Sequence, residues 1–403
     1  MMRRMFTARR RIAAAIATAA AAAAIGCGIA LPAKASPAAE RILHEDSVDS
    51  VRDSYIVVLK NSAGFKAESP EGRRLAAKYG ATVEWTYDAA LNGYAVRVSA
   101  SGARSLAEDP AVAFVEQDRK VHLNATQILP PWGLDRIDQA RLPLSQTYTY
   151  PDSAGRSATV YVIDTGVRVT HTEIAGRARY GYDFVDRDAV ASDGHGHGTH
   201  VATTVAGRTY GVAKLTNIVA VRVLDNSGAG TLSTVLAGVD WVTSRRVGPA
   251  VANMSLGTSA STALDTAVRN SIASGVTYAV AAGNSNVNAA YFSPARVGSA
   301  LTVGSSNRVD FRSSFSNYGS LLDMFAPGSS ITAGYHTSDT ATATLSGTSM
   351  AAPHVAGAAA IYLTSHPTAG PATVHSALVN GATTGVLSNI GTGSPNRLLR
   401  LVP

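Results

Sequence analysis

Cysteine is almost absent from this chain of 403 residues, which contains a single one, Cys27. That residue lies in an uncharged, Ala-rich stretch at positions 12–31, which follows five arginines and precedes the tripeptide at 33–35. A basic start, an apolar run and an A-x-A site are typical of a secretory signal peptide. We expect residues 1–35 to be removed, leaving a secreted chain without disulfide bonds. A membrane anchor and lipid modification of Cys27 are the alternative interpretations.

Acidic residues are absent from the first 35 positions, although these hold six of the 35 basic residues. The remainder carries 29 basic against 28 acidic residues, so the formal net charge of +7 belongs mostly to the expected leader. This balance argues against a nucleic-acid partner, and we expect no membrane association after the leader is removed. Internal repeats and blocks of like charge are absent too, which favours a monomer with one main domain at residues 127–403.

Among the residues that are present, Ser349 lies in a short Gly-led segment just before an Ala-rich helix expected over residues 351–363. Pro353 fits the first turn of such a helix, where its missing N–H has no cost. A serine in this position directs its hydroxyl and its own N–H the same way. A nucleophile of acyl transfer and its oxyanion donor need that geometry. The alternative is an ordinary helix N-cap serine.

Asp164 ends a β-branched apolar run at residues 159–163, which is typical of a buried strand. Open α/β sheets place catalytic groups at the carboxyl ends of such strands. The alternative is a turn-forming aspartate that binds its own backbone.

His197 is flanked by glycines and begins a short helix expected over residues 199–207. At a helix N-terminus the field disfavours imidazolium, so we expect a neutral ring that can act as a base. The cluster His195, His197 and His200 also permits a zinc site, although no glutamate accompanies it.

The order Asp164, His197, Ser349 is the order of the triad in subtilisin. The chain resembles the subtilisin-like serine proteases, most closely their proteinase K branch, from about residue 131 to the C-terminus. Six stretches carry the resemblance in family order: 160–166, 196–202, 253–257, 279–284, 313–319 and 346–357.

The resemblance implies a secreted serine endopeptidase in which Ser349 attacks the peptide carbonyl, His197 transfers the proton and Asp164 orients the imidazole. It also implies an oxyanion hole made of the Ser349 N–H and the Asn284 side chain. An esterase is less favoured, because no Gly-x-Ser-x-Gly elbow surrounds Ser349.

The same resemblance implies a groove that binds an extended peptide as an added strand. Its expected walls are two edge segments and the wall of the S1 pocket, which receives the residue before the scissile bond (P1). These residues are Ser255, Leu256 and Gly257, then Gly228 and Gly230, then Ala281, Ala282 and Gly283. The S1 residues are small and uncharged, so we expect an apolar or aromatic P1 residue with broad tolerance.

Four positions depart from the family pattern. Thr258 replaces a usual glycine beside the substrate-binding edge. Leu232 stands where the proteinase K branch carries a tyrosine over an apolar subsite (S4), which suggests a more open subsite. Thr203 replaces a usual glycine after His200 and could shift the helix of His197. His195 occupies a position that is commonly Asn or Ser and could add a pH dependence of its own.

The segment before the peptidase reads as a small α+β, ferredoxin-like domain. It has strands expected at 54–60, 93–98 and 110–116 and helices at 69–80 and 101–109. It resembles the inhibitor propeptide of the family, so we expect residues 36–126 to be a propeptide whose folded part spans about 53–121. The resemblance implies that its tail, residues 124–127, lies in the active cleft and is cut by the enzyme itself.

Residues 127–403 alternate apolar strands with helix-like stretches. This pattern predicts an α/β, subtilisin-like three-layer fold with a mostly parallel sheet between helices. The strands are expected at 218–224, 251–254, 277–282 and 300–305, and the helices at 233–244 and 262–274.

Without disulfide bonds, structural Ca²⁺ is the expected stabiliser. The resemblance implies one site at Asp323 with the carbonyls of Pro294 and Arg296. It implies a second at Asp135, Asp138 and Gln139, with Ser145 or Thr147 nearby. Solvated turns are the alternative for both sets.

Overall fold

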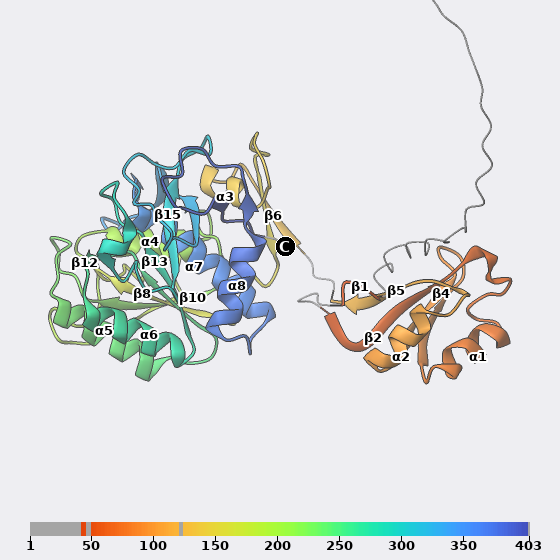
Figure 1. Ribbon diagram of the computed structural model, residues 1–403. Coiled ribbons are helices and arrows are strands. Elements are labelled where there is room, and N and C mark those ends of the chain that lie inside the picture. The colour runs from red at the N-terminus through yellow and green to blue at the C-terminus, as the bar shows by residue number, and fades with distance from the viewer. Residues whose placement is uncertain (1–41, 46–49, 121–123, 402–403) are drawn as a thin grey trace, which may run out of the picture. The chain divides into compact units, whose positions relative to one another are not determined.

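The computed structural model describes residues 42–45, 50–120 and 124–401, so the expected signal peptide lies outside the described residues. The chain divides into two compact units, Met1–Val121 and His122–Pro403. Both are drawn in Figure 1. Within the described ranges, none of the helices is long and apolar enough to cross a membrane.

The N-terminal unit is a five-stranded sheet with the order β1-β5-β2-β4-β3. Alternate residues of β2, Tyr55, Val57 and Leu59, share one core with Leu75 of α1 and Leu106 of α2. Both helices therefore cover the same face of the sheet, as an α+β domain requires. The elements are β1 (Ile42–Leu43), β2 (Ser50–Leu59), α1 (Pro70–Lys78), β3 (Thr82–Tyr87), β4 (Gly93–Arg97), α2 (Ala100–Ala107) and β5 (Val112–Arg119).

The C-terminal unit is built on a nine-stranded sheet with the order β19-β20-β16-β15-β13-β11-β8-β10-β9. Its pairs are parallel except for β19 with β20, which confirms the predicted α/β class. The strands are β8 (Thr159–Asp164), β9 (Ala178–Asp183), β10 (Asn217–Arg222), β11 (Ala250–Met254), β13 (Val276–Ala281), β15 (Leu301–Ser306), β16 (Met324–Pro327), β19 (Thr383–Thr384) and β20 (Arg397–Leu398).

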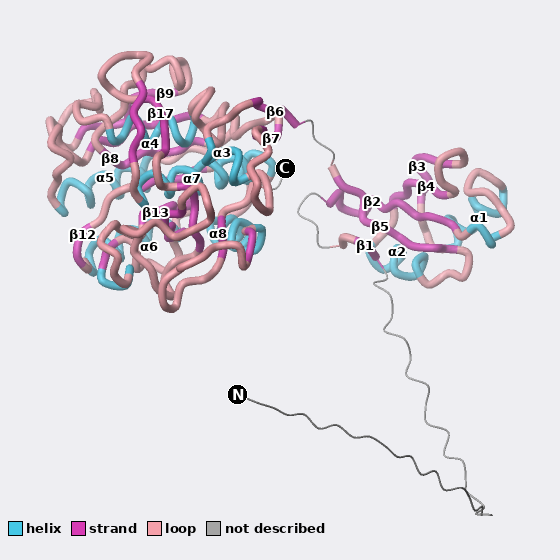
Figure 2. The backbone as a smooth tube through the Cα atoms, turned by 90° about the horizontal axis from the view of Figure 1, so that it is seen from above, coloured by secondary structure: helices cyan, strands magenta, loops and turns pink. Residues whose placement is uncertain are grey.

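Helices and three short antiparallel strand pairs surround this sheet, and Figure 2 shows the helices on either side of the strands. The helices are α3 (Trp132–Ile137), α4 (His197–Ala206), α5 (Leu232–Arg245), α6 (Thr262–Ala273), α7 (Thr348–Ser365) and α8 (Pro371–Gly381). The short pairs are β6 (Asn124–Ile128) with β7 (Thr147–Pro151), β12 (Thr258–Ser259) with β14 (Phe292–Ser293), and β17 (Ile331–Gly334) with β18 (Thr342–Leu345).

Strand β8 contributes apolar side chains to both faces of the sheet. Val160 and Val162 join a core with α4 and α7, whereas Tyr161 and Ile163 join a second core with α5 and α6. Successive side chains of a strand point to opposite faces, so a strand covered on both sides reads as a continuous apolar run. The result is three layers, with the sheet between two sets of helices.

The strand order places Asp164 where a ligand site is expected. In the sheet, β8 lies between β10 on one side and β11 on the other, and both of these strands come later in the chain. The carboxyl end of β8 is therefore a topological switch point, where α/β sheets form their binding crevice. Asp164 is the last residue of β8 and is in register with Arg222, the last residue of β10.

The first strand of this unit differs from the sequence-based prediction. We expected residues 124–127 in the active cleft, but β6 pairs antiparallel with β7, with Ile128 opposite Thr147. The Gln127 side chain donates a hydrogen bond to the carbonyl of Thr209 at 3.1 Å. At the other end of the unit, the Leu401 N–H donates to the carbonyl of Ile137 in α3 at 2.6 Å.

Candidate active site

Asp164 and His197 form the best-defined part of the site. The distance from His197 Nδ1 to Asp164 Oδ1 is 2.7 Å, and Asp164 is fully buried. The same carboxylate oxygen accepts the Thr165 N–H at 2.7 Å, which fixes its position. Because the carboxylate accepts from Nδ1, the neutral ring leaves Nε2 as the acceptor, which is the atom a general base uses.

The pKa of His197 is set by opposing effects. Burial lowers it, but the charge and the hydrogen bond of Asp164 raise it, and the charge of Asp193 raises it further. The net result is a pKa above the ordinary 6.5. The helix N-terminus was predicted to keep the ring neutral, but the two carboxylates outweigh the forces that disfavour its charge.

Ser349 is the second residue of α7, which begins at Thr348 with Gly347 as N-cap. Its N–H is therefore one of the free donors of the first turn. Pro353 is the sixth residue of the helix and not in its first turn, as we had expected. Because Pro353 has no N–H, the Ser349 carbonyl receives no helical hydrogen bond, and the Ser255 hydroxyl donates to it instead at 2.8 Å.

The Ser349 hydroxyl donates to the carbonyl of Ser255 at 3.1 Å. In the described residues it makes no hydrogen bond to His197. Ser255 and His197 line the same cavity of about 500 Å³, so the three candidate catalytic groups belong to one site. Hydrogen bonds between a nucleophile and its base often form only in the substrate complex, so this orientation is compatible with catalysis.

Asn284 follows β13 and is held by the residue before the nucleophile. Its Oδ1 accepts both the N–H and the hydroxyl of Thr348 at 2.8 Å. This directs Nδ2 away from Thr348. A methyl group built on Gly347 would lie 3.4 Å from Asn284 Nδ2 and 3.6 Å from the Ser349 nitrogen. The two predicted oxyanion donors therefore lie close together on one side of Gly347.

Thr348 was not predicted from the sequence. Besides holding Asn284, its hydroxyl accepts the Gly283 N–H at 3.1 Å, which ties the end of β13 to α7. The sequence feature that could have indicated its role is its position, since it places a hydroxyl between the N-cap glycine and the nucleophile.

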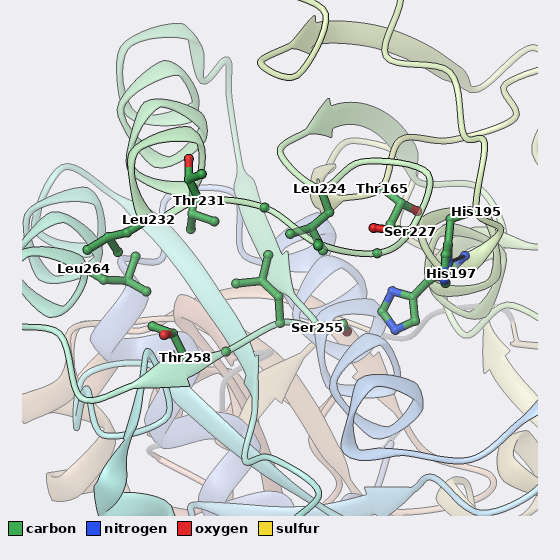
Figure 3. A pocket seen from close by; sticks show the side chains of 16 residues that line it. Thr165, His195, His197, Leu224, Ser227, Thr231, Leu232, Ser255, Thr258 and Leu264 are labelled. Carbon is green, nitrogen blue, oxygen red and sulfur yellow. Dashed lines mark hydrogen bonds between the residues drawn. The ribbon is translucent and has the colours of Figure 1, made fainter.

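The cavity is polar at one end and apolar at the other. Figure 3 shows His195 and His197 at one end and Leu232 and Leu264 at the other. Both predicted edge segments form its walls, and Leu232 is 41% exposed. The predicted S1 residues are not among those that line it. The residues that line the cavity include Thr165, His195, His197, Leu224, Gly228, Gly230, Leu232, Val235, Ser255, Leu256, Gly257 and Leu264.

The predicted S1 residues Ala281, Ala282 and Gly283 lie at and just after the end of β13. Ala281 and Ala282 are buried. Gly283 has a φ of +101°, and a side chain there would collide with Asn317. They connect to the site through Gly283, which donates to Thr348 as described.

The histidine cluster does not converge on a metal. His200 Nε2 lies 3.0 Å from the carbonyl of Ile331 and 3.2 Å from that of Ala343. Burial lowers the pKa of His200 to about 4, so its ring is neutral. Over the described ranges, no group of three side chains is arranged to hold a metal ion.

In the first predicted calcium set, the Asp323 carboxylate makes hydrogen bonds within the protein. Asp323 Oδ2 accepts the Thr302 N–H at 2.7 Å, and Oδ1 lies 3.0 Å from His375 Nε2. Both carboxylate oxygens thus have protein partners, and a cation bound at Asp323 near the carbonyls of Pro294 and Arg296 would share Oδ1 with His375.

The second set fits better. Asp135 Oδ1 and Gln139 Oε1 both accept the Ser145 N–H at 2.9 Å, and Asp138 Oδ2 accepts the Thr149 N–H at 2.6 Å. Asp138 Oδ1 is buried without a hydrogen-bond partner among the described residues. Burial, with the charge of Asp135 adding to it, raises the pKa of Asp138 to about 6. An unpartnered buried carboxylate oxygen beside further oxygen ligands suits a hard cation.

A buried arginine supports the site and was missed from the sequence. Arg222 donates to Asp183 and Asp186 at 2.6 Å and to Asn226 Oδ1 at 2.8 Å. Asn226 in turn packs against the backbone of Gly194. This network joins the end of β10 to the loop that precedes His197, and no local sequence pattern marks it.

Comparison with known proteins identifies two families in this chain. The subtilase family matches residues 155–397, and the peptidase inhibitor I9 family matches residues 44–124. An extracellular serine proteinase of Thermus sp. is 49% identical over 386 residues, covering 91% of this chain and 94% of the relative. Proteinase R of Parengyodontium album is 42% identical over 364 residues, covering 88% and 90%.

The crystal structure of a cold adapted subtilisin-like serine proteinase is 53% identical, with a TM-score of 0.67. It covers 68% of this chain and 99% of its own. These likenesses confirm the predicted fold and family. The chain belongs to the subtilase family of serine peptidases and carries an inhibitor I9 domain before the peptidase domain.

Proposed function

We propose that this chain is a secreted serine endopeptidase that hydrolyses peptide bonds through Asp164, His197 and Ser349. The observation that carries the proposal is the 2.7 Å bond between His197 and Asp164 at a cavity whose wall, Ser255, also contacts Ser349. The names of the relatives, which include an extracellular proteinase, support secretion.

The reaction follows from these positions. The Ser349 hydroxyl attacks the peptide carbonyl while His197 Nε2 takes its proton, and Asp164 stabilises the imidazolium that forms. The Ser349 N–H and Asn284 Nδ2 donate to the oxyanion of the tetrahedral intermediate. His197 then protonates the leaving amine, and water hydrolyses the acyl-enzyme by the same steps in reverse.

Broad specificity for apolar chains is the expected selectivity. The substrate would lie as a strand between the Ser255–Gly257 and Gly228–Gly230 segments. Small, uncharged residues at Ala281, Ala282 and Gly283 favour an apolar or aromatic P1 residue. The exposed Leu232 leaves the apolar end of the cavity open, which suits a second apolar side chain farther from the scissile bond.

The N-terminal unit would act as an intramolecular inhibitor and chaperone until the enzyme cuts itself free. The match to the inhibitor I9 family supports this role. The pairing of Gln127 and Ile128 with β7 would then be the arrangement of the new N-terminus after cleavage, because residues 124–128 cannot pair with β7 and lie in the cleft at once. The cleaved bond would lie toward the end of β6, near Gln127.

The mature enzyme is proposed to be a monomer stabilised by Ca²⁺. Asp135, Asp138 and Gln139 would hold the ion, and its positive charge would compensate the unpartnered oxygen of Asp138. Bound calcium would supply cohesion between α3 and the segment leading to β7, with no part in the bond cleavage.

Self-processing provides the test. The full chain with Ser349→Ala should remain one polypeptide on a gel, whereas the wild-type chain should separate into propeptide and peptidase. Ser285→Ala, in the exposed loop beside Asn284, is the matched control and should process normally. A serine-directed phosphonate should label the wild-type enzyme and not Ser349→Ala. Processing of purified Ser349→Ala without another protease would refute the assignment of Ser349.

A further inference from the structure

His195 lies in the same cavity as His197 but takes no part in the reaction proposed above. Its backbone is fixed at both ends, because its N–H donates to Asp193 Oδ1 at 3.0 Å and its carbonyl accepts the Tyr335 hydroxyl at 3.0 Å. The ring centroids of His195 and His197 are 6.3 Å apart in an edge arrangement. Figure 3 shows both rings at the polar end of the pocket.

One hydrogen bond fixes the tautomer of the His195 ring. The His197 N–H donates to His195 Nδ1 at 3.3 Å, so Nδ1 is an acceptor. A neutral imidazole that accepts at Nδ1 carries its proton on Nε2. Among residues 124–401, no hydrogen-bond partner is found for His195 Nε2. The wall beside the catalytic base thus presents a free N–H donor.

The position of this donor along the groove follows from Gly228. A methyl group built on Gly228 would lie 3.2 Å from His195 Nε2, so the donor sits over the substrate edge that contains Gly228 and Gly230. His197 marks the scissile bond, and this edge would bind the residues before it. The donor therefore faces the side chain that precedes P1, which is P2.

The apolar end of the cavity supports this placement. Alternate side chains of an extended chain point to the same side, so P2 and P4 project together. A P2 side chain beside His195 puts P4 toward Leu232 and Leu264 at the other end of the same cavity. The cavity thus matches one polar and one apolar side chain, two residues apart.

We infer that His195 is a specificity-determining residue that donates a hydrogen bond from Nε2 to a substrate P2 side chain bearing an oxygen acceptor. The inference rests on the proposed peptidase function and narrows its substrate class. The preferred substrates are peptides with an apolar P4 residue and an amide or carboxylate side chain at P2. A hydroxyl or amide at a substrate position matched by a free donor is discriminated from an apolar isostere because the donor would otherwise lose its hydrogen bond to water.

The test compares peptides that differ only at P2, with Asn in one and the near-isosteric Leu in the other. We expect kcat/KM of the processed wild-type enzyme to favour Asn by about three- to tenfold. In His195→Asn, Oδ1 can still accept the His197 N–H, and the Nδ2 donors of the shorter side chain lie closer to the backbone than Nε2 of His195 does. There the ratio should fall to about one.

Each outcome decides the inference or the function beneath it. A wild-type ratio near one, or a ratio that His195→Asn leaves unchanged, would overturn the role of His195 while the peptidase activity stands. A ratio of two substrates is insensitive to a general loss of active enzyme, so a merely structural role of His195 would not change it. Failure of the wild-type enzyme to cleave either peptide, or any member of a mixed peptide library, would overturn the proposed function itself.

Discussion

The imidazole of His197 is charged or neutral according to its contact with Asp164, since burial alone would keep it neutral. The carboxylates raise its pKa, so the basic form needed for catalysis is populated above a pKa higher than 6.5. The same shift stabilises the folded protein below pH 6.5. That contribution is lost as the pH rises through the folded-state pKa.

We therefore predict that kcat/KM rises with pH through an apparent pKa above 6.5. The measurement is a pH–rate profile on a neutral peptide, combined with the NMR titration of the His197 ring. The two midpoints should agree. A midpoint below 6.5 would mean that Asp164 and Asp193 do not outweigh burial in solution.

The second residue-scale prediction concerns Asn284. Asn284→Ala should lower kcat by about 10²–10³ with little change in KM, because its donor acts on the oxyanion and not on the bound peptide. Thr348→Val is a companion variant that removes one of the two bonds orienting the amide, and it should lose less activity. An unchanged kcat in Asn284→Ala would remove this residue from the oxyanion hole.

At the scale of elements, α4 carries the threonine that departs from the family pattern. Thr203 is buried, and its hydroxyl donates to the Thr199 carbonyl at 2.8 Å and reaches the Gly334 carbonyl at 3.4 Å. The bond between His197 and Asp164 is nevertheless 2.7 Å long. The helix therefore accommodates the branched side chain without moving the base away from its carboxylate.

Thr203→Gly should accordingly affect stability more than catalysis. The free energy of unfolding should fall by about 1–2 kcal/mol, because a helix-interior glycine costs about 1 kcal/mol and a buried hydrogen bond is lost. Urea denaturation on a Ser349→Ala background avoids self-digestion, and kinetics on the single variant should stay within about twofold of wild type. A tenfold loss of kcat at unchanged stability would show instead that Thr203 positions His197.

The sequence predicted those elements whose periodicity or motif is local. The predicted strands 159–163 and 277–282 are largely apolar because both of their faces are covered, and α5 and α6 were placed to within two residues. Strand β3 was missed because its residues are mostly exposed and lack apolar alternation. The start of α7 was misplaced because Pro353 indicates a first turn, whereas Ser255 supplies from elsewhere the hydrogen bond that proline cannot.

The candidate site divides in the same way. The family motifs identified the candidate catalytic residues, but no sequence pattern near Arg222 predicts its contacts with Asp183 and Asn226. Asp183 meets Arg222 only when β9 and β10 pair, and Asn226 approaches Arg222 from the loop after β10. The engagement of Asp323 by His375 was also unpredictable, because 52 positions separate them.

For the whole molecule, acid should be more damaging than alkali. His200 and His354 are buried, and burial lowers the pKa of each to about 4, below the 6.5 of an unfolded chain. Their contribution to stability is complete above pH 6.5 and is lost as the pH falls toward 4. Each shift corresponds to roughly 3 kcal/mol once both states are protonated.

The unfolding free energy of Ser349→Ala, measured by urea denaturation, should therefore fall between pH 7 and pH 4. The fall should be smaller than the two histidine shifts together, because the raised pKa of Asp138 acts in the opposite direction. NMR titration of ring protons provides the specific control, since both rings should remain neutral at pH 5. Protonation of either ring in the folded protein at pH 6 would contradict this assignment.

Calcium is the other whole-molecule variable. Removing divalent ions with a chelator should lower the melting temperature of the processed enzyme, and added Ca²⁺ should restore it by mass action. Asp138→Asn should abolish the response, whereas Asp323→Asn should preserve it if the second set is the binding site. A melting temperature indifferent to chelator would rule out the proposed ion.

The hydrogen bond between Leu401 and Ile137 brings the last described residue against the first helix of the catalytic unit. When the two ends of a domain lie close together, they can be linked and the chain opened in a loop instead, because the contacts within the domain do not depend on chain connectivity. A circularly permuted catalytic unit, with a short Gly-Ser linker across this junction and new termini in an exposed loop, should retain its architecture.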